Sequence, residues 1–195
     1  AEMCEGASAA LAAPPPLDLS LGDPASTADW ADCLGGSSLM PGHLRLPRAG
    51  DVAKLPGYSE GAWWVQDIAA ALPARLLGNG EGRTVLDVGA APGGKTMQLA
   101  AAGWRVTALD ASARRIERLA QNLVRVGLEA ETLHGDGRAL PPEREWDAVL
   151  LDAPCSATGI FRRHPDVLYR IGARHIEDRA EQQALLLERA SNWVK

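Results

Sequence analysis

With 195 residues, of which 46% are hydrophobic and 5% aromatic, the chain can form one full domain, or one domain and part of another, around a core of mainly Ala, Leu and Val. Its three cysteines are widely spaced, and neither a signal peptide nor an apolar run of membrane-spanning length is visible, so we exclude a disulfide framework and a membrane protein and expect a cytoplasmic one. The net charge of −5 argues weakly against a polyanionic partner.

The first 57 residues contain too little pattern for an independent domain. Residues 1–16 are rich in Ala and end in three prolines, which indicates a linker or a disordered end. Residues 17–57 are expected to form part of a small α/β module that precedes the main domain. Its elements are predicted as a strand at 17–21, a helix at 27–35 and a strand at 43–47.

Residues 58–195 are expected to form the main domain. A helix is predicted over 59–78, kinked or divided at Pro73, with one of the adjacent Trp63 and Trp64 packing inward. Strands and helices then alternate, which predicts a parallel sheet with right-handed crossovers. The strands are expected at 83–89, 105–110, 129–136 and 146–154, and the helices at 93–103, 112–127 and 173–194.

Four aspartates are expected at one edge of this sheet. Asp87, Asp110, Asp136 and Asp152 each lie near the end of a predicted strand or just after it. Ligands of such sheets bind at the carboxyl ends of the strands, so these carboxylates should form an acidic rim around a ligand.

The segment from Gly89 to Thr96 reads GAAPGGKT, which fits the phosphate-binding loop of nucleoside triphosphatases. Asp87 would repel a triphosphate, and Pro92 has no N–H to offer one. Asp110 ends the next strand, where an acid binds ribose hydroxyls in nucleoside-binding folds. We therefore expect S-adenosyl-L-methionine, a cationic nucleoside without phosphate, with Asp110 at the ribose and Asp136 at the adenine. A P-loop NTPase is the alternative.

The segment "LDAPC" at the end of the fourth strand places the thiol of Cys155 beside the methyl group of such a cofactor. A thiolate that adds to carbon-6 of a pyrimidine creates an enamine whose carbon-5 can attack a methyl group. Asp152 can contact the base or the sulfonium, and Arg162 and Arg163 can supply the positive charge that favours a thiolate. The alternative is a buried structural cysteine.

Positive charge is concentrated after this segment. Residues 1–44 contain six acids and no Lys or Arg, so the rest of the chain is close to neutral. Residues 160–180 contain five arginines and three acids. A local basic face can bind nucleic acid despite an acidic total, so we predict that Arg162, Arg163 and Arg170 contact RNA phosphates. The alternative is a solvated, salt-bridged helix surface.

Four segments together resemble the Sun/Fmu/NOL1 family of RNA cytosine carbon-5 methyltransferases: "DVGAAPGGKT", "LDAS", "GDGRAL" and "LDAPCSATGIFRRHPDV". The resemblance covers about residues 15–195. It implies a class I, Rossmann-like methyltransferase fold, S-adenosyl-L-methionine as cofactor and RNA as substrate, with small-subunit ribosomal RNA expected. The cofactor-binding residues that it implies are Ala90, Ala91, Pro92, Gly93, Gly94, Lys95, Thr96, Asp110, Asp136 and Asp152, with Lys95 at the methionine end or in the active site.

The resemblance also implies another role for Cys155. In the RNA enzymes of this family the attacking thiol belongs to a later Thr-Cys-Ser motif, and the Pro-Cys cysteine is tied to product release. Compared with what the resemblance implies, we expect the sequence up to Lys195 to lack this motif, the last three of seven strands and an N-terminal helical RNA-binding domain. We therefore expect a fragment that is inactive alone. A non-catalytic RNA- or cofactor-binding module is a further alternative, and the four histidines show no metal-ligand spacing.

Overall fold

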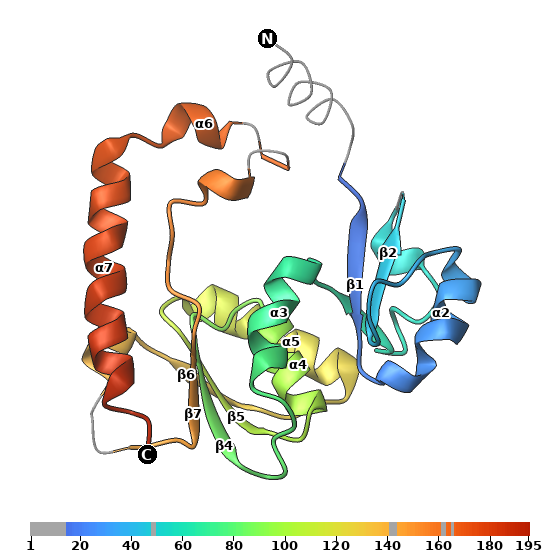
Figure 1. Cartoon of the computed structure of the whole chain (residues 1–195), viewed down its shortest axis with the longest axis horizontal. Helices are drawn as coiled ribbons and strands as arrows, with labels where there is room; N and C mark the ends of the chain where they lie inside the picture. The colour runs from blue at the N-terminus through green and yellow to red at the C-terminus, as the bar shows by residue number, and fades with distance from the viewer. Residues whose placement is uncertain (1–14, 48–49, 141–143, 161–162, 165) are drawn as a thin grey trace.

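The computed structural model describes residues 15–47, 50–140, 144–160, 163–164 and 166–195. A three-stranded antiparallel sheet of order β2-β1-β3 precedes a four-stranded parallel sheet of order β6-β5-β4-β7. Figure 1 shows the small sheet to one side of the large one, with helix α3 between them. In the part of the chain that is described, none of the helices combines the length and the apolar character needed to span a bilayer.

The small unit contains β1 (Leu17–Leu21), α2 (Thr27–Leu34), β2 (His43–Leu46) and β3 (Trp63–Val65). Alternation along the strands divides the sheet into an apolar and a polar face. The apolar face forms a core of Leu19, Leu21, Leu44, Leu46 and Trp63, against which α2 packs.

The polar face of the small sheet is centred on the buried carboxylate of Asp18. Two nitrogens of Arg45 donate to it at 2.7 Å, and the backbone N–H of Ile68 donates to it at 3.1 Å. Burial alone would raise the pKa of Asp18, but these donors outweigh burial and lower the pKa below its ordinary value. Because Ile68 is the first residue of α3 (Ile68–Leu76), this carboxylate fastens the small unit to the large one.

The prediction of one helix over residues 59–78 is wrong in its first half. Residues Trp63–Val65 form β3, which pairs with β1, and α3 begins only at Ile68, where the side chain of Asp67 accepts the N–H of Ala69 at 2.9 Å. Pro73 lies inside α3 and does not divide it. The small unit was predicted to end at residue 57, but its third strand, β3, lies beyond that residue.

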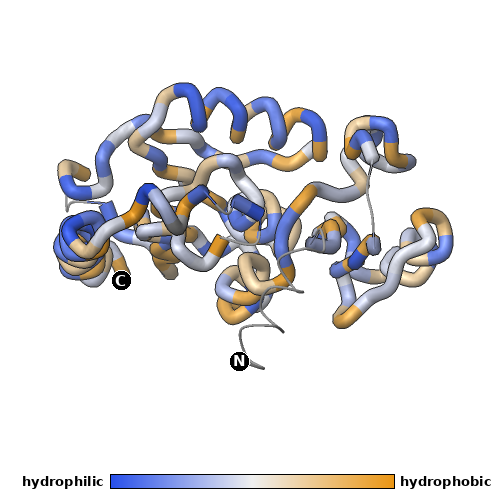
Figure 2. The backbone as a smooth tube through the Cα atoms, turned by 90° about the horizontal axis from the view of Figure 1, so that it is seen from above, coloured by the Kyte–Doolittle hydropathy of each residue, from blue (hydrophilic) through white to orange (hydrophobic). Residues whose placement is uncertain are grey.

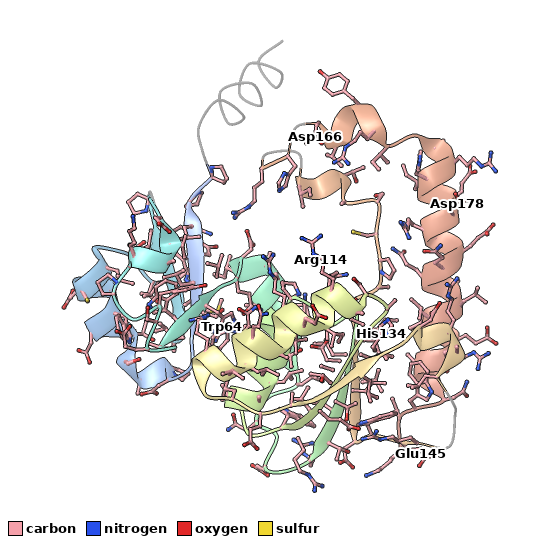
Figure 3. The ribbon with its side chains drawn as sticks, turned by 180° about the vertical axis from the view of Figure 1, so that it is seen from behind. Trp64, Arg114, His134, Glu145, Asp166 and Asp178 are labelled. Carbon is pink, nitrogen blue, oxygen red and sulfur yellow. The ribbon has the colours of Figure 1, made fainter. Side chains whose placement is uncertain are left out.

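Both tryptophans of β3 are buried, because consecutive side chains of a strand point to opposite faces. Trp63 is 0% exposed in the core of the small unit, and Trp64 is 2% exposed in a core of the large unit. Figure 3 labels Trp64 where the small sheet meets the larger unit. The expectation that one of the two packs inward understates the packing, since each fills a different core.

The parallel sheet follows the predicted alternation of strands and helices. Its elements are β4 (Thr84–Val88), α4 (Gly94–Ala101), β5 (Arg105–Asp110), α5 (Ala113–Val126), β6 (Glu131–His134), β7 (Ala148–Leu151), the short helices η4 (Thr158–Ile160) and α6 (Val167–Arg170), and α7 (Ala173–Ser191). The predicted ends of α5 are confirmed, because Ser112 caps its start and Gly127 ends it in a left-handed conformation. This is the expected Rossmann-like α/β arrangement.

Helices cover both faces of the parallel sheet (Figure 1). Helices α3, α4 and α5 pack on the face that carries Val85 and Ala108, and α7 packs on the face that carries Leu86 and Leu109. Burial on both faces explains why the strands read as continuous apolar runs. Seen from above, α5 and α7 lie on different sides of the molecule, and hydrophilic residues predominate on their outward surfaces (Figure 2).

The packing of Trp64 leads to the first prediction. Trp64→Ala should lower the free energy of unfolding by about 3–5 kcal/mol, because a large cavity forms between the two units. Urea denaturation measures the change. The matched control is Val65→Ala, at the next residue of the same strand, which is 48% exposed and should cost less than about 1 kcal/mol. Equal costs for the two variants would contradict the role assigned to Trp64.

Candidate functional site

The carboxyl ends of the parallel strands border a cleft of about 610 Å³. This volume lies within the usual range for small-molecule sites, about 300–1,000 Å³. The parallel direction of the strands brings residues far apart in the sequence to the same edge. Residues predicted for the site that line the cleft are Asp110, Asp136, Asp152 and Cys155. A larger hollow of about 920 Å³ lies at the opposite, amino-terminal edge and contains none of them.

Asp110 is almost fully buried at the end of β5 and is held by several donors. Its Oδ1 accepts the backbone N–H of Ser112 at 3.0 Å, and its Oδ2 accepts that of Ala91 at 3.2 Å. Nη1 of Arg115 lies 3.3 Å from the same Oδ2. The carboxylate thus links the loop after β4 to the start of α5.

The other two carboxylates of the cleft are also paired with basic side chains. Nε of Arg138 donates to both oxygens of Asp136 at 3.0 Å, and this interaction lowers the pKa of Asp136 below its ordinary value. Nζ of Lys95 donates to Oδ2 of Asp152 at 2.7 Å. Asp152 is half exposed, whereas Lys95 is largely buried.

The expectation of four aspartates at one edge is confirmed for the three that line the cleft and wrong for Asp87, which is fully buried. The rim is not acidic in net charge, because each of the three carboxylates has a basic partner. Arg115 and Arg138 were not predicted for the site, although both closely follow the aspartates with which they pair. Arg179 and Gln182, which line the cleft from α7, were not predicted either. No local pattern relates these two residues to the strands.

Asp87 is buried beneath the cleft edge, in β4. Thr96 donates its hydroxyl to Oδ2 of Asp87 at 2.6 Å, while Oδ1 is buried without a partner among the described residues. Burial raises the pKa of Asp87 to about 6. This side chain is the least satisfied acid near the site.

Gly89 occupies the point where the ends of β4 and β7 approach each other. Its φ is +79°, and a Cβ there would lie 2.3 Å from the carbonyl oxygen of Asp152. Only glycine fits this approach. The predicted cofactor residues Ala90 to Thr96 form the following loop and the first turn of α4, with Ala90, Ala91, Gly93 and Thr96 buried. None of these seven lines the cleft itself, although Lys95 reaches Asp152.

Cys155 is exposed, so it is not the buried structural cysteine of the alternative hypothesis. Its Sγ accepts the backbone N–H of Ala157 at 3.3 Å. Ala157 has a φ of 57°, which is uncommon for a residue with a side chain. Among the described residues, no group of three or more His, Cys, Asp or Glu side chains is arranged to hold a metal ion.

Two of the three predicted RNA-binding arginines already have acidic partners. Nη2 of Arg163 lies 3.1 Å from Asp67 at the start of α3, and Nη2 of Arg170 lies 2.7 Å from Asp166. Arg162 lies outside the described residues. Contact of these arginines with RNA stays a prediction.

Arg114 is a further basic residue on this side of the molecule, and it was not among the predicted RNA-binding arginines. Figure 3 shows that Arg114 projects from the start of α5 toward the side on which η4 and α6 lie.

The family model for the 16S rRNA methyltransferase RsmB/F matches residues 74–195. The chain belongs to the RsmB/F family. It is 43% identical over 150 residues to the ribosomal RNA small subunit methyltransferase B of Shewanella oneidensis, a match that covers 74% of this chain and 35% of that protein. The protein of the same name from Erwinia tasmaniensis is 42% identical with the same coverage. The chain thus spans about a third of the length of these curated relatives.

Solved structures share the fold of this RsmB/F chain. The crystal structure of PH0851 superposes with a TM-score of 0.88 and 28% identity, covering 96% of this chain and 46% of that one. NSun6 from Pyrococcus horikoshii, solved with SFG, gives a TM-score of 0.69 and 27% identity over 80% of this chain and 40% of that one. A methyltransferase homologue from the same organism, at 22% identity and a TM-score of 0.79, supports the fold alone; the match covers 96% of this chain and 64% of that one.

The buried acid leads to a pH-dependent prediction. Unfolded Asp87 ionises near pH 3.8, and the folded protein holds its proton to about pH 6. Between these values the folded state binds more protons, so its stability should fall as pH rises, by about 3 kcal/mol in all. Asp87→Asn cannot ionise, so its free energy of unfolding should rise relative to that of the wild type by about 2 kcal/mol between pH 4 and pH 7. Urea denaturation across this range checks it, and parallel curves for the two proteins would contradict it.

Proposed function

We propose that this chain forms the cofactor-binding part of an enzyme that transfers a methyl group from S-adenosyl-L-methionine to carbon-5 of a cytosine in small-subunit ribosomal RNA. The observation that carries the proposal is the convergence of Asp110, Asp136, Asp152 and Cys155 on one cleft beside the glycine-rich loop. The relatives named ribosomal RNA small subunit methyltransferase B support the reaction. NSun6 with SFG, an S-adenosylmethionine analogue, supports the cofactor.

The residues of the cleft fit this cofactor. Asp110 would hold the ribose hydroxyls and Asp136 the adenine, because both are hydrogen-bond acceptors at the ends of adjacent strands. The buried Oδ1 of Asp87, which has no partner among the described residues, leaves an unsatisfied acceptor beneath the edge of the cleft where the cationic methionine end would lie. Gly89 would lie against that end of the molecule, and the loop from Ala90 to Thr96 would support Gly89 without lining the cleft.

When bound, S-adenosylmethionine supplies a methyl group that its sulfonium activates. Carbon-5 of cytosine is a poor nucleophile, so the reaction needs a thiolate to add at carbon-6. By its family resemblance Cys155 acts in product release, and a Thr-Cys-Ser motif provides the attacking thiol. Asp152 lies three residues before Cys155 and is half exposed, so it can accept a hydrogen bond from the base, while Lys95 fixes its orientation.

Calorimetry tests the cofactor assignment. S-Adenosylmethionine and S-adenosylhomocysteine should bind without magnesium, and Asp110→Ala should weaken binding about tenfold to a hundredfold because ribose hydroxyls lose a charged acceptor. Asp32→Ala, an exposed position on α2, is the matched control and should change nothing. Binding of magnesium-ATP with no response to either nucleoside would overturn the assignment in favour of a P-loop NTPase.

Transfer of tritium from labelled cofactor to unmodified small-subunit ribosomal RNA by the full-length protein tests the reaction. Incorporation at carbon-5 of cytosine is the expected result. Cofactor and RNA binding without any transfer would instead make this a non-catalytic binding module.

The basic segment leads to a prediction for RNA binding. Replacing Arg163 and Arg170 by Gln should weaken RNA binding and reduce the slope of log affinity against log salt by about 0.7–0.9 for each phosphate that the protein no longer neutralises. Filter binding over a range of salt concentrations measures the slope. Arg105→Gln, at the opposite edge of the sheet, removes the same kind of charge and should leave the slope unchanged. An unchanged slope in the double variant would mean that the two arginines serve only their ion pairs.

A further inference from the structure

The loop that follows β4 cannot satisfy all of its own backbone carbonyls. The carbonyl of Ala90 accepts the N–H of Gly93 at 2.9 Å, and the carbonyl of Gly93 accepts the N–H of Met97 at 2.8 Å. The two carbonyls between them, those of Ala91 and Pro92, receive no backbone N–H among the described residues. Ala91 is buried, so its carbonyl depends on a side chain for a donor, whereas Pro92 is exposed, so a side chain that donates to its carbonyl takes the place of water.

Helix α5 supplies both donors. Arg115 donates to the first of these carbonyls, and Nδ2 of Asn122 donates to the second at 2.9 Å. Between them, Leu119 packs against Gly93, where an added Cβ would lie only 3.1 Å from its Cγ. The loop is therefore held at three successive residues by one helix.

The three residues of α5 lie on one side of the helix. Positions 115, 119 and 122 are separated by four and three residues, the spacing that places side chains in a row along one face. This row faces the loop, as its contacts with the loop demonstrate. Asn is a weaker helix former than Ala, so at position 122 it gives up helix stability for a contact that Ala could not make.

Asn122 differs from Arg115 in one useful respect. Arg115 lines the cleft and also contacts Asp110, so a change there would disturb several interactions at once. Asn122 is not among the residues that line the cleft. An effect of Asn122 on a ligand in the cleft is therefore indirect, and the hydrogen bond to Pro92 makes the loop its direct route.

We propose that Asn122 is a positioning residue, which fixes the path of the loop from Ala90 to Gly93 before a ligand binds. Its amide N–H holds the Pro92 carbonyl, while Arg115 and Leu119 fix the residues on either side. Gly89, directly before this loop, lines the cleft, so the cofactor would bind beside a loop that is already ordered, and less free energy would be lost on binding. The identity of the ligand rests on the proposed function, whereas the fixing of the loop does not.

Hydrogen–deuterium exchange of the full chain without ligand tests the fixing of the loop. In Asn122→Ala, the backbone amides of residues 90–97 should exchange about 3- to 10-fold faster, while those of β4 and β5 should keep their rates. Asn122→Asp has the same shape but no N–H donor and should behave like Asn122→Ala. The matched control is Gln121→Ala, at the exposed neighbouring position of α5, which should exchange like the wild type.

Three results would overturn the proposal. They are an unchanged loop in Asn122→Ala, wild-type exchange in Asn122→Asp, and faster exchange spread evenly over the whole sheet, which would indicate a general loss of stability.

Calorimetry with S-adenosylhomocysteine supplies the second readout. Both Asn122 variants should bind it about 3- to 10-fold more weakly than the wild type and Gln121→Ala. Equal affinity in all four proteins would overturn the effect on the ligand. If the wild type fails to bind while loop exchange still responds to Asn122, the proposed function fails and the positioning role stands.

Discussion

The site depends on the close approach of Gly89 to the carbonyl of Asp152. At this point the chain leaving β4 and the chain leaving β7 lie so close that no methyl group would fit between Gly89 and the carbonyl oxygen of Asp152. Parallel strands bring their carboxyl ends to one edge, but they do not bring the connecting loops into contact. That contact is possible because Gly89 has no side chain. Gly89 and the loop that carries Cys155 therefore border the same cleft, and Lys95, in the first turn of α4, can pair with Asp152.

Charge in the cleft is balanced and locally organised. Asp110, Asp136 and Asp152 are each compensated by a nearby Arg or Lys, so a ligand that bonds to them must compete with an existing partner. Recognition then depends on hydrogen-bond geometry more than on long-range attraction. Asp87 is different, because it lies in the protein interior with a raised pKa and one unsatisfied oxygen. Replacing Asp87 by Asn should stabilise the folded protein, but it should impair function if the unsatisfied oxygen takes part in ligand binding.

The sequence predicts those parts of the fold that depend on local signals. Alternating strands and helices, the Ser112 cap and the Gly127 stop all follow from short-range chemistry. Strand β3 could not be found in this way, because it exists only through pairing with β1, more than forty residues earlier. The motifs placed Asp110, Asp136, Asp152 and Cys155 at one cleft. They could not predict that Arg179 and Gln182 line the cleft, because this depends on how α7 packs. They could not predict the contact of Asn122 with the loop either, because it depends on how α5 packs beside the loop.

The two adjacent tryptophans of β3 connect the packing of the small unit to that of the candidate site. Trp63 is embedded in the small core, and Trp64 packs in the same cluster as Ala90 and Ala91 of the loop after β4. Close-packed interiors transmit displacement, and two side chains on consecutive residues cannot move independently. A tilt of the small sheet would therefore displace Trp64 together with Trp63 and disturb the packing against Ala90 and Ala91. A partner that binds the small sheet and shifts it would in this way change the geometry of the cleft without contacting the cleft itself.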